Sequence, residues 1–339
     1  MTRGRIPELL QSTIRETAKL TMPVPPRSRT PDGTCRILSL DGGGAKGFYT
    51  LGVLRELEAM LGGPLCDHFD VIFGTSTGSI IASLIALGHS VDDIYSLYRQ
   101  HVPSIMKASS RAAKSEALAK VGSEVFGKQT FESVRTNLGV VATKWQIETP
   151  MIFKGFVEQA HGRSGSFVAG FGCTISDAVQ ASCSAYPFFN RKMVTTSTGD
   201  LVELIDGGYC ANNPTLYALA DAVSALRYEP EDCRVISVGC GGYPQPRYPI
   251  HRRLINRFWL VQLLQKTIEI NTASMDQLRM VLFANVPTVR VNDTFDKPEM
   301  ATDLFEHDMG KLNLLRQRGA DSFSARERLI GSILAGKAD

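Results

Sequence analysis

The sequence predicts an α/β protein, in which buried strands alternate with helices along the chain. One pattern occurs twice near the start and carries this prediction. Residues 35–40 form an apolar strand pattern, followed by a glycine-rich loop and a helical pattern over 48–61. Residues 71–73 end a second buried strand, and apolar residues then recur at helical spacing from 80 to 87. Further strands are predicted at 147–153, 201–205 and 234–238.

The composition limits the class of protein. The chain has 339 residues, 43% of them hydrophobic and 21% charged, so it can bury a large core. A net charge of +3 is too small to indicate a DNA or RNA polymer as partner. Seven scattered cysteines without a C-x-x-C pair favour reduced thiols over disulfides or a zinc site. We therefore predict a cytoplasmic protein with no metal centre.

The second strand joins its helix through Gly74-Thr-Ser76-Thr-Gly78, a G-x-S-x-G pattern. A sharp strand-to-helix turn raises the central side chain above the turn, and glycines on either side leave room for close backbone contact. The hydroxyl of Ser76 would then lie at the positive N-terminal end of a helix. A bare match is usually an ordinary turn, but the flanking strand and helix supply the required context. Ser76 is therefore the candidate nucleophile, and Gly74 and Gly78 form its elbow.

The loop over residues 41–47 admits three interpretations. Its glycines match a dinucleotide fingerprint, but the next strand ends at Phe73-Gly74 and lacks the acidic residue expected there. A phosphate-binding P-loop would need Ser or Thr after Lys46, where the chain has glycine. In the third, an oxyanion hole, Lys46 adds positive potential to N–H donors from Gly42, Gly43 and Gly44. The loop alone leaves these open, and the neighbouring turn with Ser76 favours acyl transfer.

Asp206 is the candidate proton acceptor. The strand over 201–205 runs into Asp206-Gly-Gly208, at the strand end where α/β sheets bind ligands. Such a sequence is often only a turn, whereas the functional interpretation lets Asp206 accept the proton of Ser76. The six histidines lie in no motif, and His101 and His161 stay open as a third catalytic residue.

The remaining segments are less specific. Residues 90–145 are predicted to be mainly helical, either as packing or as a lid over the site. The apolar cluster at 186–189 either packs in the core or lines an acyl-chain pocket. We predict three parts: an N-terminal helix and Pro-rich tether over 1–34, a catalytic core over 35–242, and a mostly helical extension over 243–339. The extension is predicted to hold a long helix over 250–283, an edge strand over 286–291 and a helical tail in which Leu329 is one of the packing positions.

Three motifs together resemble those of the patatin-like phospholipases: the glycine loop at 41–47, the elbow at 74–78 and Asp206-Gly-Gly208. Asn212-Asn-Pro214 and residues 181–187 are similar to further stretches of that family, and the resemblance covers about 35–242. It implies a three-layer α/β/α fold with a central, mostly parallel sheet and added helices at both ends. It also implies a Ser76–Asp206 dyad that hydrolyses acyl esters, with Gly42, Gly43, Gly44 and Lys46 in the oxyanion loop.

The parts outside the core are similar to a bacterial branch of the family, the patatin-like effectors of cyclic-oligonucleotide antiphage defence (CBASS). That resemblance implies a cyclic dinucleotide as activator, membrane phospholipid as substrate and action at the inner membrane surface. The basic segment after Pro244 is where we expect the activator, and no cofactor is expected for the chemistry. The oligomeric state stays open, with a homodimer or a higher oligomer compatible with the sequence. The alternative is a non-hydrolytic nucleotide-sensing module that uses the glycine loop.

Overall fold

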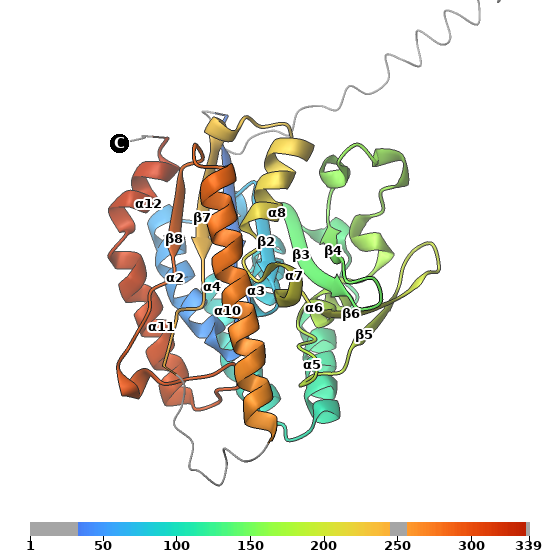
Figure 1. The fold of residues 1–339 in the computed structure, drawn as a ribbon. Coiled ribbons are helices and arrows are strands. Elements are labelled where there is room, and N and C mark those ends of the chain that lie inside the picture. Colours follow the sequence, from blue (N-terminus) through green and yellow to red (C-terminus); the bar gives the residue numbers. More distant parts are fainter. Residues whose placement is uncertain (1–32, 245–255, 337–339) are drawn as a thin grey trace, which may run out of the picture.

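The computed structural model describes residues 33–244 and 256–336, and one central sheet organises them (Figure 1). The strands of the sheet are β1 (Cys35–Leu40), β2 (Val71–Thr75), β3 (Asn137–Lys144), β4 (Pro150–Lys154), β5 (Lys192–Thr195), β6 (Leu201–Asp206), β7 (Cys233–Val238) and β8 (Thr288–Val291). The helices are α2 (Gly47–Leu61), α3 (Thr77–Ala86), α4 (Val91–Lys107), α5 (Arg111–Phe126), α6 (Ile175–Ser182), α7 (Gly208–Ala211), α8 (Thr215–Ala220), α10 (Asn256–Leu282), α11 (Met309–Ser324) and α12 (Glu327–Leu334).

The centre of the sheet is parallel and one side of it is antiparallel. Strands β3, β2, β1, β7 and β8 lie side by side in that order, each parallel to its neighbour. Strands β4 and β6 run antiparallel to β3, and β5 runs antiparallel to β6. Because parallel neighbours need crossover connections, helices cover both faces of this sheet.

Two apolar cores, one on each face of the sheet, give the molecule three layers. Successive side chains of β1 belong to different cores. Ile37 packs with α7, α8 and the inner side of α10, whereas Leu38 and Leu40 pack with α2 and α3. Figure 1 shows α10 lying across one face of the sheet and α11 and α12 at its β8 side. The three-layer α/β/α fold expected from the resemblance is confirmed.

One central element of the sheet differs from the prediction. Residues 137–144, assigned to a mainly helical region, form β3, which pairs with β2, β4 and β6. Strand β5 was also missed, and the strand expected over 147–153 is β4, at Pro150–Lys154. The apolar pattern of β3 is interrupted by Gly139, which has no side chain to mark a buried face. Its strand state therefore depends on its neighbours in the sheet.

The chain after residue 242 packs directly on the sheet and on α2. Strand β8 forms an edge of the sheet, as predicted, and α10 lies within the segment predicted to be a long helix. Helices α2 and α11 approach so closely that a Cβ at Gly52 would lie 1.9 Å from the carbonyl oxygen of Arg316. A Cβ at Gly319 would lie 2.0 Å from the oxygen of Tyr49, so the crossing requires glycine on both helices. Leu329, expected to pack, is instead 48% exposed.

Some predictions fall outside the described residues. These are the N-terminal helix and tether, apart from its last two residues, and most of the basic segment after Pro244. Across residues 33–244 and 256–336, the structure contains no helix that is both long enough and apolar enough to cross a bilayer.

Candidate active site

The turn between β2 and α3 raises Ser76 above the sheet. Ser76 has φ 51° and ψ −124°, a backbone conformation that is uncommon for a residue with a side chain. A Cβ at Gly74 would lie 2.3 Å from the carbonyl oxygen of Gly78, and a Cβ at Gly78 would lie 2.3 Å from that of Leu40. The tight turn therefore needs glycine at both positions, which is the physical reason for the G-x-S-x-G pattern.

Strand β3 brings Ser76 and Asp206 together. The last residue of β2, Thr75, pairs with Val141, and Asp206, the last residue of β6, pairs with the next residue, Ala142. Residues 139–141 of β3 pair with both β2 and β4, and residues 142–143 pair with both β6 and β4, so β4 occupies one edge of β3 and the other two strands share the opposite edge. Strands β2 and β6 therefore meet end to end.

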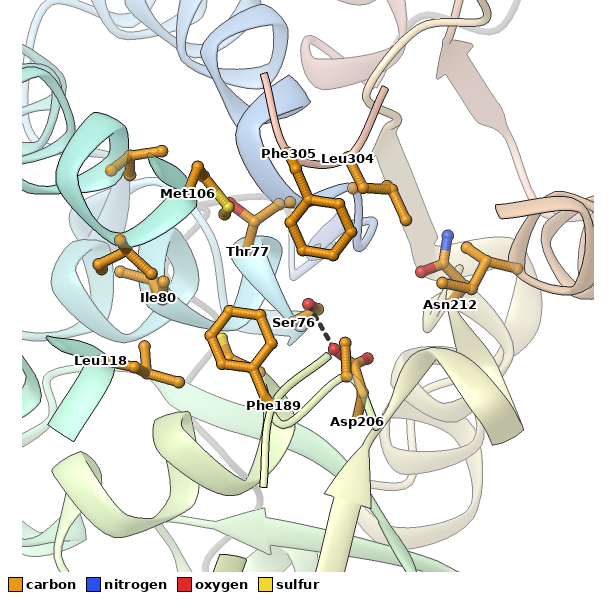
Figure 2. A pocket seen from close by; sticks show the side chains of 17 residues that line it. Ser76, Thr77, Ile80, Met106, Leu118, Phe189, Asp206, Asn212, Leu304 and Phe305 are labelled. Carbon is orange, nitrogen blue, oxygen red and sulfur yellow. Dashed lines mark hydrogen bonds between the residues drawn. The ribbon is translucent and has the colours of Figure 1, made fainter. Parts of the chain in front are cut away.

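The two side chains form a direct hydrogen bond at this junction. The Oγ of Ser76 donates to Oδ2 of Asp206 over 2.7 Å, drawn as a dashed line in Figure 2. They are 130 positions apart in the chain, and the structure brings them together as the sequence analysis predicted. His101 and His161 do not line the cavity around this pair, and His161 instead contacts Asp221 at 2.7 Å.

The carboxylate of Asp206 is almost fully buried and is held in place by the turn that follows it. The N–H of Gly208 donates to Oδ1 over 2.7 Å, which leaves Oδ2 for Ser76. Burial raises the pKa of Asp206 to about 6, although the hydrogen bonds from Gly208 and Ser76 lower it. A carboxylate with this raised pKa is a stronger base than an exposed one and remains ionised at neutral pH.

Ser182, which the sequence analysis did not single out, fixes the elbow from α6. Its Oγ accepts a 2.8 Å hydrogen bond from the N–H of Ser76 and donates a 2.6 Å bond to the oxygen of Val141. The oxygen of Ser182 also accepts the N–H of Gly207 over 3.3 Å. One residue thus ties the nucleophile turn to β3 and to the Asp206 turn. The sequence signal that could have identified Ser182 is its place in residues 181–187, which are similar to a stretch of the family.

Two of the three loop glycines that were predicted as N–H donors line the site. Gly43 and Gly44 line the cavity that holds Ser76 and Asp206, and no acceptor in the described part of the chain takes their N–H groups. The structure differs from the prediction at Gly42, whose N–H donates to the oxygen of Asn212 over 3.0 Å. The side-chain amide of Asn212 donates back to the oxygen of Gly42 over 3.1 Å. Gly42 therefore anchors the loop, and Gly43 and Gly44 remain as the candidate oxyanion donors.

Lys46 also departs from the prediction. It lines a separate cavity with Gly42 and Gly43 and is absent from the lining of the Ser76 cavity. Its Nζ lies 3.9 Å from a carboxylate oxygen of Glu269 on α10. Lys46 can therefore affect the reaction only through the field and position of the loop, because it does not face the reacting groups.

The cavity over Ser76 is narrow and mostly apolar. Helices α4 and α5, predicted as packing or a lid, contribute to its wall, as does Phe189 of the predicted apolar cluster. The rings of Phe189 and Phe305 point into it near Ser76 (Figure 2). Its larger apolar side chains are Ile80, Val102, Ile105, Met106, Leu118, Phe189, Ile268, Leu304 and Phe305. This lining suits an acyl chain better than a charged substrate.

Within the described ranges, no group of three or more His, Cys, Asp or Glu residues is placed so that it could hold a metal ion. The arrangement that is present consists of a serine hydroxyl, a buried carboxylate, two main-chain donors and an apolar cavity. Together these groups can supply nucleophilic acyl transfer.

Comparison with known proteins agrees with this acyl-transfer chemistry. The family of patatin-like phospholipases matches residues 38–219, more than half of the chain. The chain is 61% identical to the cUMP-AMP-activated phospholipase of Escherichia coli over 303 residues, which are 89% of this chain and 95% of that protein. It is 28% identical to patatin-like protein 2 of Oryza sativa, over 62% of each chain. It is 27% identical to the cGAMP-activated phospholipase of Vibrio cholerae, over 65% of this chain and 68% of that protein. The chain belongs to the patatin-like phospholipases.

Proposed function

We propose that this chain hydrolyses acyl ester bonds of membrane phospholipids, with Ser76 as nucleophile and Asp206 as general base. The observation that carries the proposal is the 2.7 Å hydrogen bond from Ser76 Oγ to a buried carboxylate, beside the N–H groups of Gly43 and Gly44. A serine hydroxyl is a weak nucleophile until a base accepts its proton and donors stabilise the oxyanion. The proposal is supported by the fact that Ser76, Asp206, Gly43 and Gly44 all line one cavity.

The reaction proceeds in two acyl transfers. Asp206 accepts the proton of Ser76 as Oγ attacks the ester carbonyl carbon, and the N–H groups of Gly43 and Gly44 bind the resulting oxyanion. The tetrahedral species collapses to an acyl-Ser76, and protonated Asp206 returns its proton to the leaving lysolipid alcohol. Water then attacks the acyl-enzyme while Asp206 takes the water proton. Release of Ser76, which regains that proton, yields a free fatty acid.

We propose further that a cyclic dinucleotide activates the enzyme at the inner membrane surface of the bacterial cytoplasm, in antiphage defence. The names of two relatives support this, since one is activated by cUMP-AMP and the other by cGAMP. The small volume of the cavity over Ser76 also supports the proposal that the enzyme is inactive until an activator binds. Its volume of about 60 Å³ is well below the roughly 300 Å³ at the lower end of ligand pockets. An acyl chain therefore needs movement of the cavity wall, which an activator can supply.

The test is release of fatty acid from phospholipid vesicles by the purified full chain, with and without a panel of cyclic dinucleotides. We expect release only with a matching dinucleotide, and loss of release in both Ser76→Ala and Asp206→Ala. Ser96→Ala, exposed on α4, is the matched control and should retain full activity. Activity retained in both site variants would refute the dyad. Dinucleotide binding without any lipid hydrolysis would favour the alternative of a nucleotide-sensing module.

A further inference from the structure

A second cavity lies next to the site and shares the glycine loop as part of its wall. Its volume is about 320 Å³, and its residues come from the loop, from α10 and from the segments after β7 and β8. It shares Gly43, Asn212, Ile268 and Leu304 with the lining of the Ser76 cavity. A molecule bound there would contact the loop that also carries the proposed oxyanion donors.

Lys46 gives this second cavity a positive charge that is only weakly held. Its side chain is 5% exposed, and the partners of its ammonium group in the described ranges are Glu269 and the ring face of Tyr243, whose centroid lies 5.9 Å from Nζ. Glu269 Oε1, at 3.9 Å, is beyond hydrogen-bond distance and belongs to a side chain that is 51% exposed. A largely buried ammonium group with no hydrogen-bonded carboxylate can gain a closer anionic partner, so the position favours an anion.

The other charges of the cavity wall are already paired. Arg290 of β8 binds both carboxylate oxygens of Asp41, one of them over 2.9 Å. Asp276 accepts a 2.9 Å hydrogen bond from Arg279. Lys46 is thus the cation in this lining that has no hydrogen-bonded carboxylate within the described chain.

We propose that the second cavity binds a phosphodiester anion through Lys46, and that this anion belongs to the cyclic dinucleotide activator. The inference rests on the activation proposed above and names its site. A lysine ammonium is a common point-charge partner for phosphate. Gln265 and Asn292 lie in the same wall; Nε2 of Gln265 already donates to Glu269 and Oδ1 of Asn292 already accepts the N–H of Gly241, which leaves Oε1 of Gln265 and Nδ2 of Asn292 for the base edges.

Hydrogen bonds connect this cavity to the oxyanion loop. On α10, Oδ1 of Asn271 accepts the N–H of Asn212 over 2.8 Å, and Oγ1 of Thr272 accepts its side-chain amide over 2.7 Å. Asn212 in turn holds Gly42 through two hydrogen bonds, one to each main-chain polar group. A ligand bound between Lys46 and α10 therefore contacts both the helix that holds Asn212 and the loop that contains Gly43. This is how its binding changes the position of the oxyanion donors relative to Ser76.

Binding is tested in full-length Ser76→Ala protein, in which lipid turnover does not interfere, by calorimetry with cUMP-AMP and cGAMP. Adding Lys46→Met should weaken binding of the matching dinucleotide by roughly tenfold or more, because one charged hydrogen bond is lost. Adding Glu269→Gln should tighten it by about threefold, because a competing negative charge near Lys46 is removed. Lys120→Met, at a side chain 75% exposed on α5, is the matched control and should leave binding within about twofold.

The two variants should change the dinucleotide affinity in opposite directions, which a purely structural effect would not do. If Lys46→Met unfolds, the affinity of Glu269→Gln still tests the inference. Binding that neither variant shifts would overturn the inference while leaving activation intact. Absence of binding by every dinucleotide in the panel would refute the activation itself. The phosphate could instead be that of the lipid headgroup. In that case Lys46→Met in the active chain would raise KM for anionic phospholipid but not for a neutral acylglycerol, with dinucleotide binding unchanged, and the inference would be wrong.

Discussion

The main-chain N–H of Ser76 and the hydroxyl of Ser182 form a 2.8 Å hydrogen bond. Ser182 is fully buried at the end of α6, and it passes the interaction on to the carbonyl of Val141 in β3. The strained backbone of Ser76 is therefore supported by a side chain more than a hundred positions away. Positions of this kind determine whether a nucleophile keeps its orientation.

We expect Ser182→Ala to lower kcat by about tenfold, with a small change in KM, because the N–H of Ser76 loses its partner and the elbow relaxes. Unfolding should become easier by about 1–3 kcal/mol. Ser182→Thr keeps the hydroxyl and should restore part of kcat. Steady-state kinetics on vesicles and chemical denaturation measure both effects. An unchanged kcat in Ser182→Ala would contradict a positioning role.

The pH dependence of activity should follow Asp206. Burial raises the pKa of its carboxyl group to about 6, and only the ionised form can accept the Ser76 proton. Below that pH, kcat/KM should fall about tenfold per pH unit, with a plateau above it. Initial rates on an uncharged short-chain ester across the pH range, in the activated enzyme, test this. A flat profile through pH 6 would show that another group is the base.

Asp206 should also lower stability at neutral pH. Because its pKa is higher in the folded chain than the ordinary 3.8, the stability linked to this group is present at low pH and is lost as pH rises through about 6. Asp206→Asn stays neutral and can still accept the N–H of Gly208. Above pH 6 it should be more stable than the parent by up to about 3 kcal/mol, with the difference vanishing toward pH 4. Urea denaturation at several pH values measures this, and a variant less stable at pH 8 would contradict it.

Gly78 should be essential for a steric reason. A Cβ there would lie 2.3 Å from the oxygen of Leu40, which belongs to a rigid strand. Gly78→Ala should therefore destabilise the protein by roughly 3 kcal/mol or more. Gly165→Ala, where an added Cβ meets nothing within 4 Å, is the control and should change stability by less than about 0.5 kcal/mol. Thermal melts of the two variants, which are alike in chemistry, give the comparison. Equal melting temperatures would contradict the close approach at Gly78.

Narrowing the apolar cavity should select against long acyl chains. Leu118 of α5 lines the cavity over Ser76, and a larger ring there fills space that an acyl chain needs. We expect Leu118→Trp to lower kcat/KM for long-chain esters by about tenfold or more, while short-chain esters lose much less. Leu329→Trp, at an exposed position of α12, is the control. Equal losses for long and short chains would show that the acyl chain binds elsewhere.

Much of the site could be predicted from local sequence because its parts are local structures. A strand, a glycine-bounded turn and a helix place Ser76, and a strand followed by Asp206-Gly-Gly208 places the carboxylate at a strand end. Each depends on residues close together in the chain, so periodicity and turn chemistry identify it. Strand β3 was not predicted, because its strand conformation depends on pairing with other strands along both of its edges.

The sequence alone determined the α/β class, the nucleophile elbow with Ser76, the candidate carboxylate of Asp206 and the glycine-rich character of the loop over 41–47. Tertiary structure alone decided that β2 and β6 meet end to end along β3, that Ser182 supports Ser76, that Gly42 anchors the loop and that Lys46 faces a second cavity. The reason is that a donor, an acceptor or a buried charge has no partner until the chain folds. Its role is set by whichever distant residue then fills the space beside it.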